Sequence, residues 1–520
     1  MAEVVQQSRV KNSIRNTLFA AIAYVVKMLL QFAVRAVFVR YFVVEYLGIN
    51  GLYSNILNVL SLAELGVGNA IVYSMYKPIA ENDIEKIKSL MALYKKLYLI
   101  IGCVVTVLGL SLIPALPYII KDAPNLEINL TAIYVLYLAQ TVIGYFFAYR
   151  RSLIFAYQRN DVESKVSLIS QILLALSQIQ IIILWKNFYA YTAAFVICGA
   201  LDALGIFVLS FKFFPEIKGK AQKLEKTDTK EIAKNTGAMV FHKIGSAVVF
   251  STDSIIISAY IGSAVLGIYS NYTLVTVALG SLINVFVTAF KGSIGNLIAS
   301  KSKEDVYKIF LALHMGSVWM TGFIFIGLFV CFQDFELVFT GNSEYLLAFS
   351  TVALLTVSFF LTYSKCMVGT FKECAGLFWN DRFRALFEAG INLGLDLLFV
   401  RFWGIDGVLL ATIISTVTTI LWIEPFVLYR HYFNKNPLKY FARYGVYLII
   451  IAIVGAAVYG TCYFIPSGSI GWFILKFAVC LILPNLLFIC IVWKTKEFKY
   501  LLSVVKGLFS KKSKPEPTEN

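Results

Sequence analysis

The chain has 520 residues, of which 59% are hydrophobic and 15% are charged, and its formal net charge is +16. Soluble domains are about half apolar and about a quarter charged, so these proportions exclude a water-soluble protein of this length. The positive charge does not indicate nucleic-acid binding, because Lys and Arg occupy short gaps between apolar runs rather than one soluble basic face.

Long apolar runs follow one another along the whole chain. A membrane-spanning helix needs roughly 20 mostly apolar residues, whereas barrel strands are shorter and alternate with period two. The polar start Met1–Asn16 leads directly into the first run, so we expect no cleavable signal peptide. The runs predict an all-α polytopic membrane protein of about fourteen transmembrane helices. They cover residues 16–39, 48–76, 94–120, 129–149, 165–185, 189–211, 236–260, 264–290, 307–332, 344–371, 383–402, 405–429, 443–465 and 470–492.

The distribution of basic residues predicts the orientation. With the N-terminus in the cytoplasm, the inside segments hold 38 of the 46 Lys and Arg, the outside loops hold four, and four lie within spans. Short cytoplasmic loops are the ones that carry an excess of positive charge. We therefore expect both termini to be cytoplasmic, in a multi-pass protein of the bacterial inner or plasma membrane.

Five short matches recur in the same order in the second half of the chain, at a nearly constant interval. Leu47-Gly48-Ile49 recurs as Leu266-Gly267-Ile268, and Asn160-Asp161 recurs as Asn380-Asp381. Each copy holds six spans, an even number, so both copies enter the membrane in the same direction, related by an axis along the membrane normal with a cleft between them. The predicted parts are an N-tail (1–15), an N-lobe (16–211), a linker (212–235), a C-lobe (236–429), two further helices (443–492) and an amphipathic cytoplasmic tail (493–520).

Four sequence features carry a resemblance to a known family. They are the lead Asn12–Thr17, Leu47-Gly48-x-x-Gly51-Leu52-Tyr53, Leu62-Ala63-Glu64-Leu65-Gly66-Val67-Gly68 and Leu266-Gly267-Ile268-Tyr269. With six plus six plus two spans, the chain resembles the polysaccharide transporter family over about residues 10–492. These proteins are flippases of O-antigen, capsule and exopolysaccharide repeat units, in the superfamily of multidrug and toxic-compound extrusion proteins and lipid II flippases.

The resemblance implies a function. The cargo would be an undecaprenyl-pyrophosphate-linked oligosaccharide, moved from the inner to the outer leaflet by alternating access for surface polysaccharide biosynthesis. Its implied partners are this lipid-linked oligosaccharide and membrane lipids, with a polysaccharide polymerase and glycosyltransferases as candidate protein partners. We expect no cofactor and no enzymatic activity.

The first span carries the candidate cargo-binding residues. Lys27, Gln31 and Arg35 follow one another at i+4 steps, so they share one helix face. A cationic stripe would bind the pyrophosphate or acidic sugars of the cargo. The alternative for Arg35 is that its side chain reaches the outer membrane surface, since Arg40 follows closely in the sequence.

Other polar residues within spans extend the candidate site. In the seventh span, the repeat mate of the first, Lys243 adjoins a polar face that includes Asp253. Asn55 in the second span and Asn271 in its repeat mate could hydrogen-bond sugar hydroxyls or pair helices. A charged side chain in a bilayer costs roughly 2.5–3.5 kcal/mol on insertion scales, so such residues usually face a cavity or a partner.

Buried acids are the candidates for coupling transport to an ion or to protons. Glu64 precedes Gly66 and Gly68 in the second span, and Glu388, Asn392 and Asp396 recur at i+4 steps in the eleventh. These acids, with Asp253, could bind an ion or proton or could instead pair helices. The same choice between function and packing applies to each of them.

Two other functional classes remain as alternatives. A drug/cation antiporter of the same superfamily would need an acidic site, whereas the first span carries two cations. A membrane polysaccharide polymerase would need a sizeable extracytoplasmic loop, and the predicted outside loops are short. The eight Cys form no CxxC pair and the three His have no metal-ligand spacing, so we predict no metal site.

Overall fold

The computed structural model describes residues 9–64, 67–121, 128–157, 159–217, 251–377 and 379–510. Within these ranges the chain is helical and contains no strand. Helices satisfy their own backbone hydrogen bonds, which is the condition for crossing a bilayer that offers no water as a partner.

Eleven helical segments of the described chain are long and apolar enough to cross a membrane, which confirms the predicted all-α polytopic fold. They are Ile22–Tyr41, Ile84–Ile119, Leu130–Ala156, Asn160–Leu184, Phe188–Phe213, Ser263–Ser300, Lys303–Thr340, Phe349–Cys374, Arg384–Phe433, Leu438–Tyr463 and Ile470–Val492. The expected second span is interrupted: α3 (Val44–Leu60) and α4 (Val67–Ala80) flank a 3₁₀ turn at Ser61–Glu64. The expected seventh span lies mostly outside the described residues.

The longest of these segments contains two antiparallel helices. Within α15 (Arg384–Thr418), Gly404 has φ 56° and ψ −131°, which ends one helix and starts the next. The Asn392 side chain donates a 3.3 Å hydrogen bond to Thr412 Oγ1 across the hairpin. A Cβ at Gly407 would overlap the carbonyl oxygen of Phe399, so a glycine is needed where the two arms meet. The turn lies between the predicted spans 383–402 and 405–429.

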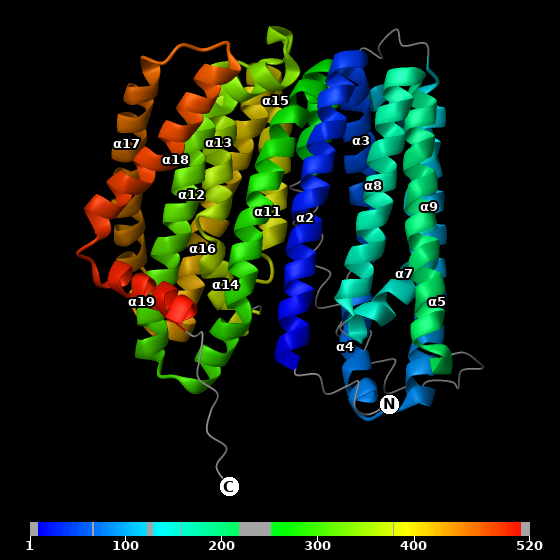
Figure 1. Cartoon of the computed structure of the whole chain (residues 1–520), viewed down its shortest axis with the longest axis horizontal. Helices are drawn as coiled ribbons and strands as arrows, with labels where there is room; N and C mark the ends of the chain where they lie inside the picture. Colours follow the sequence, from blue (N-terminus) through cyan, green and yellow to red (C-terminus); the bar gives the residue numbers. More distant parts are fainter. Residues whose placement is uncertain are drawn as a thin grey trace. The chain divides into compact units, whose positions relative to one another are not determined.

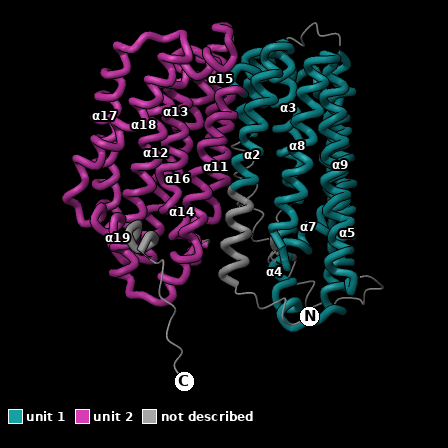
Figure 2. Tube along the Cα trace, in the orientation of Figure 1, with its two compact units in different colours: residues 1–270 teal, residues 271–520 magenta. Residues whose placement is uncertain are grey.

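The chain forms two compact units, residues 1–270 and residues 271–520 (Figure 2). The helices are labelled in Figure 1. Unit 1 contains α2 (Arg9–Tyr41), α3, α4, α5 (Ile84–Ser111), α6 (Leu116–Ile119), α7 (Leu130–Ala156), α8 (Asn160–Leu184), α9 (Phe188–Phe213), a helical stretch at 251–260 and the beginning of α11 (Ser263–Ser300). Unit 2 contains the rest of α11, then α12 (Lys303–Thr340), α13 (Phe349–Tyr363), α14 (Cys366–Cys374), α15, α16 (Ile420–Val427), a π-helical turn (Leu428–Phe433), α17 (Leu438–Tyr463), α18 (Ile470–Val492) and α19 (Lys496–Ser510).

The two copies of the Leu-Gly-Ile motif pack against each other within unit 1. A Cβ on Gly48, near the start of α3, would overlap the carbonyl oxygen of Ser263. A Cβ on Gly267, near the start of α11, would overlap the carbonyl oxygen of Val44. Gly267 is the repeat counterpart of Gly48, and Ser263 is the counterpart of Val44 at the same interval, so each motif makes the same contact with the other. This reciprocity is what a twofold-related duplication produces.

Candidate functional site

The α2 helix directs two cations into unit 1. Lys27 Nζ donates a 2.7 Å hydrogen bond to Ser167 Oγ on α8, and Arg35 Nη1 donates a 2.8 Å hydrogen bond to Ser270 Oγ on α11. Both residues are partly buried, whereas Gln31 between them is exposed. Among the residues that the structure describes, no carboxylate lies within ion-pair distance of Lys27, so its positive charge is solvated there only by a neutral hydroxyl.

A cavity of about 440 Å³ lies among α7, α8 and α9, and Ser167, the partner of Lys27, forms part of its wall. The ammonium of Lys27 is therefore at the edge of this cavity. Polar side chains from all three helices line the space. The lining comprises Gln140, Thr141, Gly144, Tyr145, Phe147, Ala148, Arg151, Ser167, Ser170, Gln171, Leu174, Phe195, Gly199, Asp202, Ala203 and Ile206.

One arginine in the cavity wall is held by two carboxylates. Arg151 at the end of α7 pairs with Asp202 on α9 and lies 3.3 Å from Glu163 on α8. The second oxygen of Asp202, Oδ1, is buried and has no hydrogen-bond partner within the described part of the chain. The positive charge of Arg151 is thus offset locally, while an acceptor oxygen of Asp202 is left without a donor.

Of the two predicted asparagines, Asn55 forms a hydrogen bond between helices. Asn55 Nδ2 donates to the carbonyl of Gly51 at 2.9 Å and to Ser254 Oγ, on the helical stretch 251–260, at 3.1 Å. The neighbouring Asn58 donates to Ser251 Oγ at 2.9 Å in the same way. Asn271 on α11 is buried. The two alternatives for Asn55 are hydrogen bonds to sugar hydroxyls and pairing of helices. Its hydrogen bond to Ser254 is a helix-pairing contact.

Glu64 ends the 3₁₀ turn in the interrupted second span. It accepts a 2.8 Å hydrogen bond from the hydroxyl of Tyr98 on α5. A Cβ on Gly68 would lie 2.7 Å from that hydroxyl and 2.9 Å from Glu64 Oε1. A side chain at position 68 would therefore crowd the hydrogen bond between Tyr98 and Glu64. Of the two other predicted residues on the seventh span, Asp253 is partly buried and Lys243 lies outside the described residues.

The acids predicted in the eleventh span lie on the first arm of α15 in unit 2. Asn392 and Asp396 are completely buried. Glu388, one turn earlier, accepts a 2.9 Å hydrogen bond from Arg384 Nη1. The face that carries these residues is therefore turned into the protein rather than toward lipid.

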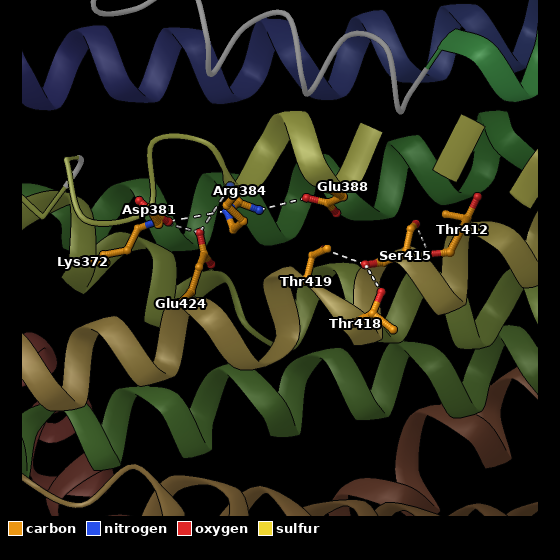
Figure 3. Close-up of polar contacts among 9 residues, drawn as sticks. All are labelled: Lys372, Asp381, Arg384, Glu388, Thr412, Ser415, Thr418, Thr419 and Glu424. Atoms are coloured by element: carbon orange, nitrogen blue, oxygen red, sulfur yellow. Dashed lines mark hydrogen bonds and ion pairs between the residues drawn. The ribbon is translucent and has the colours of Figure 1, made fainter. Parts of the chain in front are cut away.

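Arg384 connects this face to a buried cluster of opposite charges, which we call the ion cluster: Lys372, Asp381, Arg384, Glu388 and Glu424 (Figure 3). Lys372 Nζ pairs with Asp381 and lies 2.8 Å from Glu424 Oε1. Arg384 lies 3.5 Å from Asp381 and 3.6 Å from Glu424. Figure 3 shows the side chains of α14, α15 and α16 converging, with Ser415, Thr418 and Thr419 continuing the row of polar groups.

Except for Glu388, the members of the ion cluster were not among the predicted site residues. Lys372, Asp381 and Arg384 fall in or beside a segment expected to be a cytoplasmic loop, where charge is ordinary. Glu424 is the signal that could have revealed the cluster, because a carboxylate within an apolar run requires a cation or a cavity. Among the described residues, no group of three or more His, Cys, Asp or Glu is arranged to hold a metal ion.

Comparison with solved structures places this fold among membrane transporters. The chain is similar to the lipid II flippase MurJ in an inward closed conformation, with a TM-score of 0.64 and 14% identity over 91% of this chain and 99% of that one. It is similar to an inward-facing multidrug resistance MATE family transporter of the MOP superfamily, with a TM-score of 0.58 and 13% identity over 79% and 98%. It is also similar to a MOP superfamily transporter from Pyrococcus furiosus, whose structure is described by the reverse polarity of its binding pocket, with a TM-score of 0.53 and 14% identity over 82% and 97%.

No curated protein matches the chain by sequence. A family model described as "Polysaccharide biosynthesis protein" matches residues 13–291, which is more than half of the chain. The matched region includes Lys27, the whole cavity and both Leu-Gly-Ile motifs. The chain therefore belongs to the polysaccharide biosynthesis protein family, with the multi-pass membrane fold of MOP superfamily transporters.

Proposed function

We propose that this protein is a flippase that moves undecaprenyl-pyrophosphate-linked oligosaccharide repeat units from the inner to the outer leaflet, for surface polysaccharide biosynthesis. The observation that carries the proposal is Lys27, a cation without a paired carboxylate in the described chain, at the edge of a polar cavity. A pyrophosphate cannot cross hydrocarbon unaccompanied. An ammonium inside the bundle supplies a charge-assisted partner for its oxygens.

The predicted orientation puts this cavity where such a cargo would enter. If both termini are cytoplasmic, the connection between α7 and α8 lies on the cytoplasmic side. Arg151 near the end of α7 and Ser167 near the beginning of α8 then line the cytoplasmic half of the bundle. We propose that the two lobes, 16–211 and 236–429, move relative to each other in alternating access, and that this movement exposes cargo held by the N-lobe first to one leaflet and then to the other.

The buried acids are the proposed coupling elements. Asp396 lies completely buried on α15, and Glu388 on the same face contacts Arg384. Glu64 and Asp253 are further candidates in unit 1. Binding and release of an ion or a proton at such a carboxylate would couple transport to the membrane potential, which supplies about 2.3 kcal/mol per charge per 100 mV.

Depletion in the native cells tests the proposed function. Loss of the protein should make undecaprenyl-linked repeat units accumulate in the inner leaflet and should lower surface polysaccharide, both measured by mass spectrometry of extracted lipids and glycans. A wild-type copy should restore both. Unchanged surface polysaccharide after depletion, in cells without a second flippase, would reject the proposal. Drug resistance without a polysaccharide defect would instead favour the drug/cation antiporter.

Lys27 provides the residue-level test. We expect Lys27→Ala to lower surface polysaccharide at least about tenfold with a normal amount of protein, because one charge-assisted contact of about 1.5–3 kcal/mol is lost. Lys27→Arg keeps the charge and should recover part of the activity. Lys96→Ala is the matched control, since Lys96 is an exposed lysine on α5. Full activity of Lys27→Ala would show that transport does not need the positive charge at position 27.

A further inference from the structure

We propose that the cavity among α7, α8 and α9 binds an uncharged sugar residue of the cargo, while Lys27 at its edge takes the pyrophosphate. This inference rests on the proposed function and divides the headgroup between two subsites. A volume of about 440 Å³ is within the range of small-molecule sites, roughly 300–1,000 Å³.

The lining has the hydrogen-bonding groups that a sugar requires. Gln140 on α7 and Gln171 on α8 line the cavity, and neither amide has a hydrogen-bond partner among the described residues. Each amide offers two donor hydrogens and an acceptor oxygen. Asp202 Oδ1 adds a buried acceptor that lacks a donor within the described chain. A ring with several hydroxyl groups can satisfy all three, since a hydroxyl both donates and accepts.

Aromatic side chains complete the cavity wall. Tyr145, Phe147 and Phe195 line the space together with the polar groups. A pyranose ring has apolar C–H surfaces as well as hydroxyls, so it needs apolar and polar partners in one pocket. Hydrophobic and aromatic walls with a few oriented polar groups are the usual composition of such sites.

The charge balance favours a neutral ligand inside the cavity. Arg151 is engaged by two carboxylates, Glu163 and Asp202, so this corner carries one more negative than positive charge. Lys27 contributes a positive charge from the edge. An anionic sugar next to Asp202 would be repelled, whereas a phosphate next to Lys27 would be attracted. The two cargo chemistries are therefore separated by the arrangement of charges.

Filling the cavity tests the inference in cells. A Cβ on Gly144 would meet no atom within 4 Å, and Gly144 lines the cavity, so Gly144→Leu places a bulky side chain at the cavity wall. Leucine is also a better helix former than glycine, so α7 should remain intact. We expect Gly144→Leu to reduce surface polysaccharide at least about tenfold at a normal protein level and unchanged Tm. Gly460→Leu is the matched control, because Gly460 on α17 is exposed and a Cβ there would also meet no atom within 4 Å.

A binding experiment separates the two subsites. Purified full-length protein in lipid nanodiscs would be titrated with methyl glycosides of the neutral sugars found in the native polysaccharide, with the corresponding uronic acid glycosides, and with inorganic pyrophosphate. We expect Gln171→Ala to weaken binding of the neutral glycoside about tenfold and to leave pyrophosphate binding unchanged. Lys27→Ala should do the reverse. Gln180→Ala, an exposed glutamine on the same helix, is the control.

The outcomes distinguish this inference from the proposed function. If wild-type protein restores surface polysaccharide and Gly144→Leu restores it equally well, the sugar subsite is rejected while the flippase function stands. If no neutral glycoside of the native polysaccharide binds, or if the uronic acids bind more tightly, the subsite is also rejected. If the wild-type gene itself fails to restore surface polysaccharide, the flippase function fails first.

Discussion

Two clusters of charged residues, one in each unit, occupy equivalent places in the repeat but are built differently. Lys372 lies near the repeat position of Arg151, and Glu424 near that of Asp202, at an interval that matches the other repeated motifs. The side chains of Arg151, Glu163 and Asp202 are 33%, 18% and 17% exposed and border an open cavity. Those of Lys372, Asp381 and Glu424 are 5%, 0% and 8% exposed. The same layout is therefore open in unit 1 and closed in unit 2.

One residue of the ion cluster has no charged counterpart at its repeat position in unit 1. Arg384, which lies near Asp381 and Glu424, occupies the repeat position of the small residue Ser164. The guanidinium brings a second cation into the ion cluster, whereas unit 1 has a serine at this repeat position and a cavity beside its charged residues. The duplicated layout thus lines a proposed binding site in one unit and connects α14, α15 and α16 through buried ion pairs in the other.

The largest effect is expected from breaking the ion cluster. Lys372→Met keeps the length of the side chain but removes a buried cation from Asp381 and Glu424. Removing one partner of a buried ion pair typically costs about 3–5 kcal/mol, because the remaining charges stay desolvated. We expect a large fall in Tm in a thermal unfolding experiment in nanodiscs, with Lys372→Arg much less affected. A wild-type Tm for Lys372→Met would show that the cluster contributes little to the stability of unit 2.

An intermediate and symmetric effect is expected at the two Leu-Gly-Ile motifs. Gly48→Ala places a methyl group onto the carbonyl of Ser263, and Gly267→Ala places one onto the carbonyl of Val44. Such overpacking costs about 1–3 kcal/mol. The two variants should lose similar amounts of stability in the same unfolding experiment. Gly51→Ala is the control, because its Cβ would meet Ser270 at an ordinary 3.9 Å. Clearly unequal losses would contradict the reciprocal contact.

The smallest effect on stability is expected from breaking the charged cluster of unit 1. Arg151→Met removes the cation between Glu163 and Asp202, but all three side chains are partly exposed, so we expect a loss of about 1 kcal/mol. Unfolding of Arg151→Met and Lys372→Met under identical conditions gives the direct comparison of the two units. If Arg151→Met lost as much stability as Lys372→Met, the charged cluster of unit 1 would contribute as much to stability as the ion cluster does.

The fold could be predicted from the sequence because spans are local features. Long apolar runs and the charges between them identify membrane helices without knowledge of their neighbours, and the turn at Gly404 lies between two predicted spans. For Lys27, the sequence predicts a polar partner but does not identify which residue that partner is. A cation in a span needs a polar surrounding, but the choice of Ser167 on α8 depends on how the helices pack.

The ion cluster could not be predicted because its members come from separate segments. Lys372, Asp381 and Glu424 do not adjoin one another in the sequence, and only the packing of α14, α15 and α16 brings them together. Asn55 shows the converse difficulty. A polar residue in a span signals that it has a partner, and nothing local distinguishes a sugar hydroxyl from the hydroxyl of Ser254.

The exchange of contacts between Gly48 and Gly267 has a consequence for the origin of the chain. When two identical subunits meet about a twofold axis, the same patch of each touches the same patch of the other, which is an isologous interface. Val44 and Ser263 are separated by the same interval as the two glycines, so the pattern of contacts is that of a symmetric dimer. Six spans with this glycine could therefore have associated with a second copy of themselves before one polypeptide joined the two.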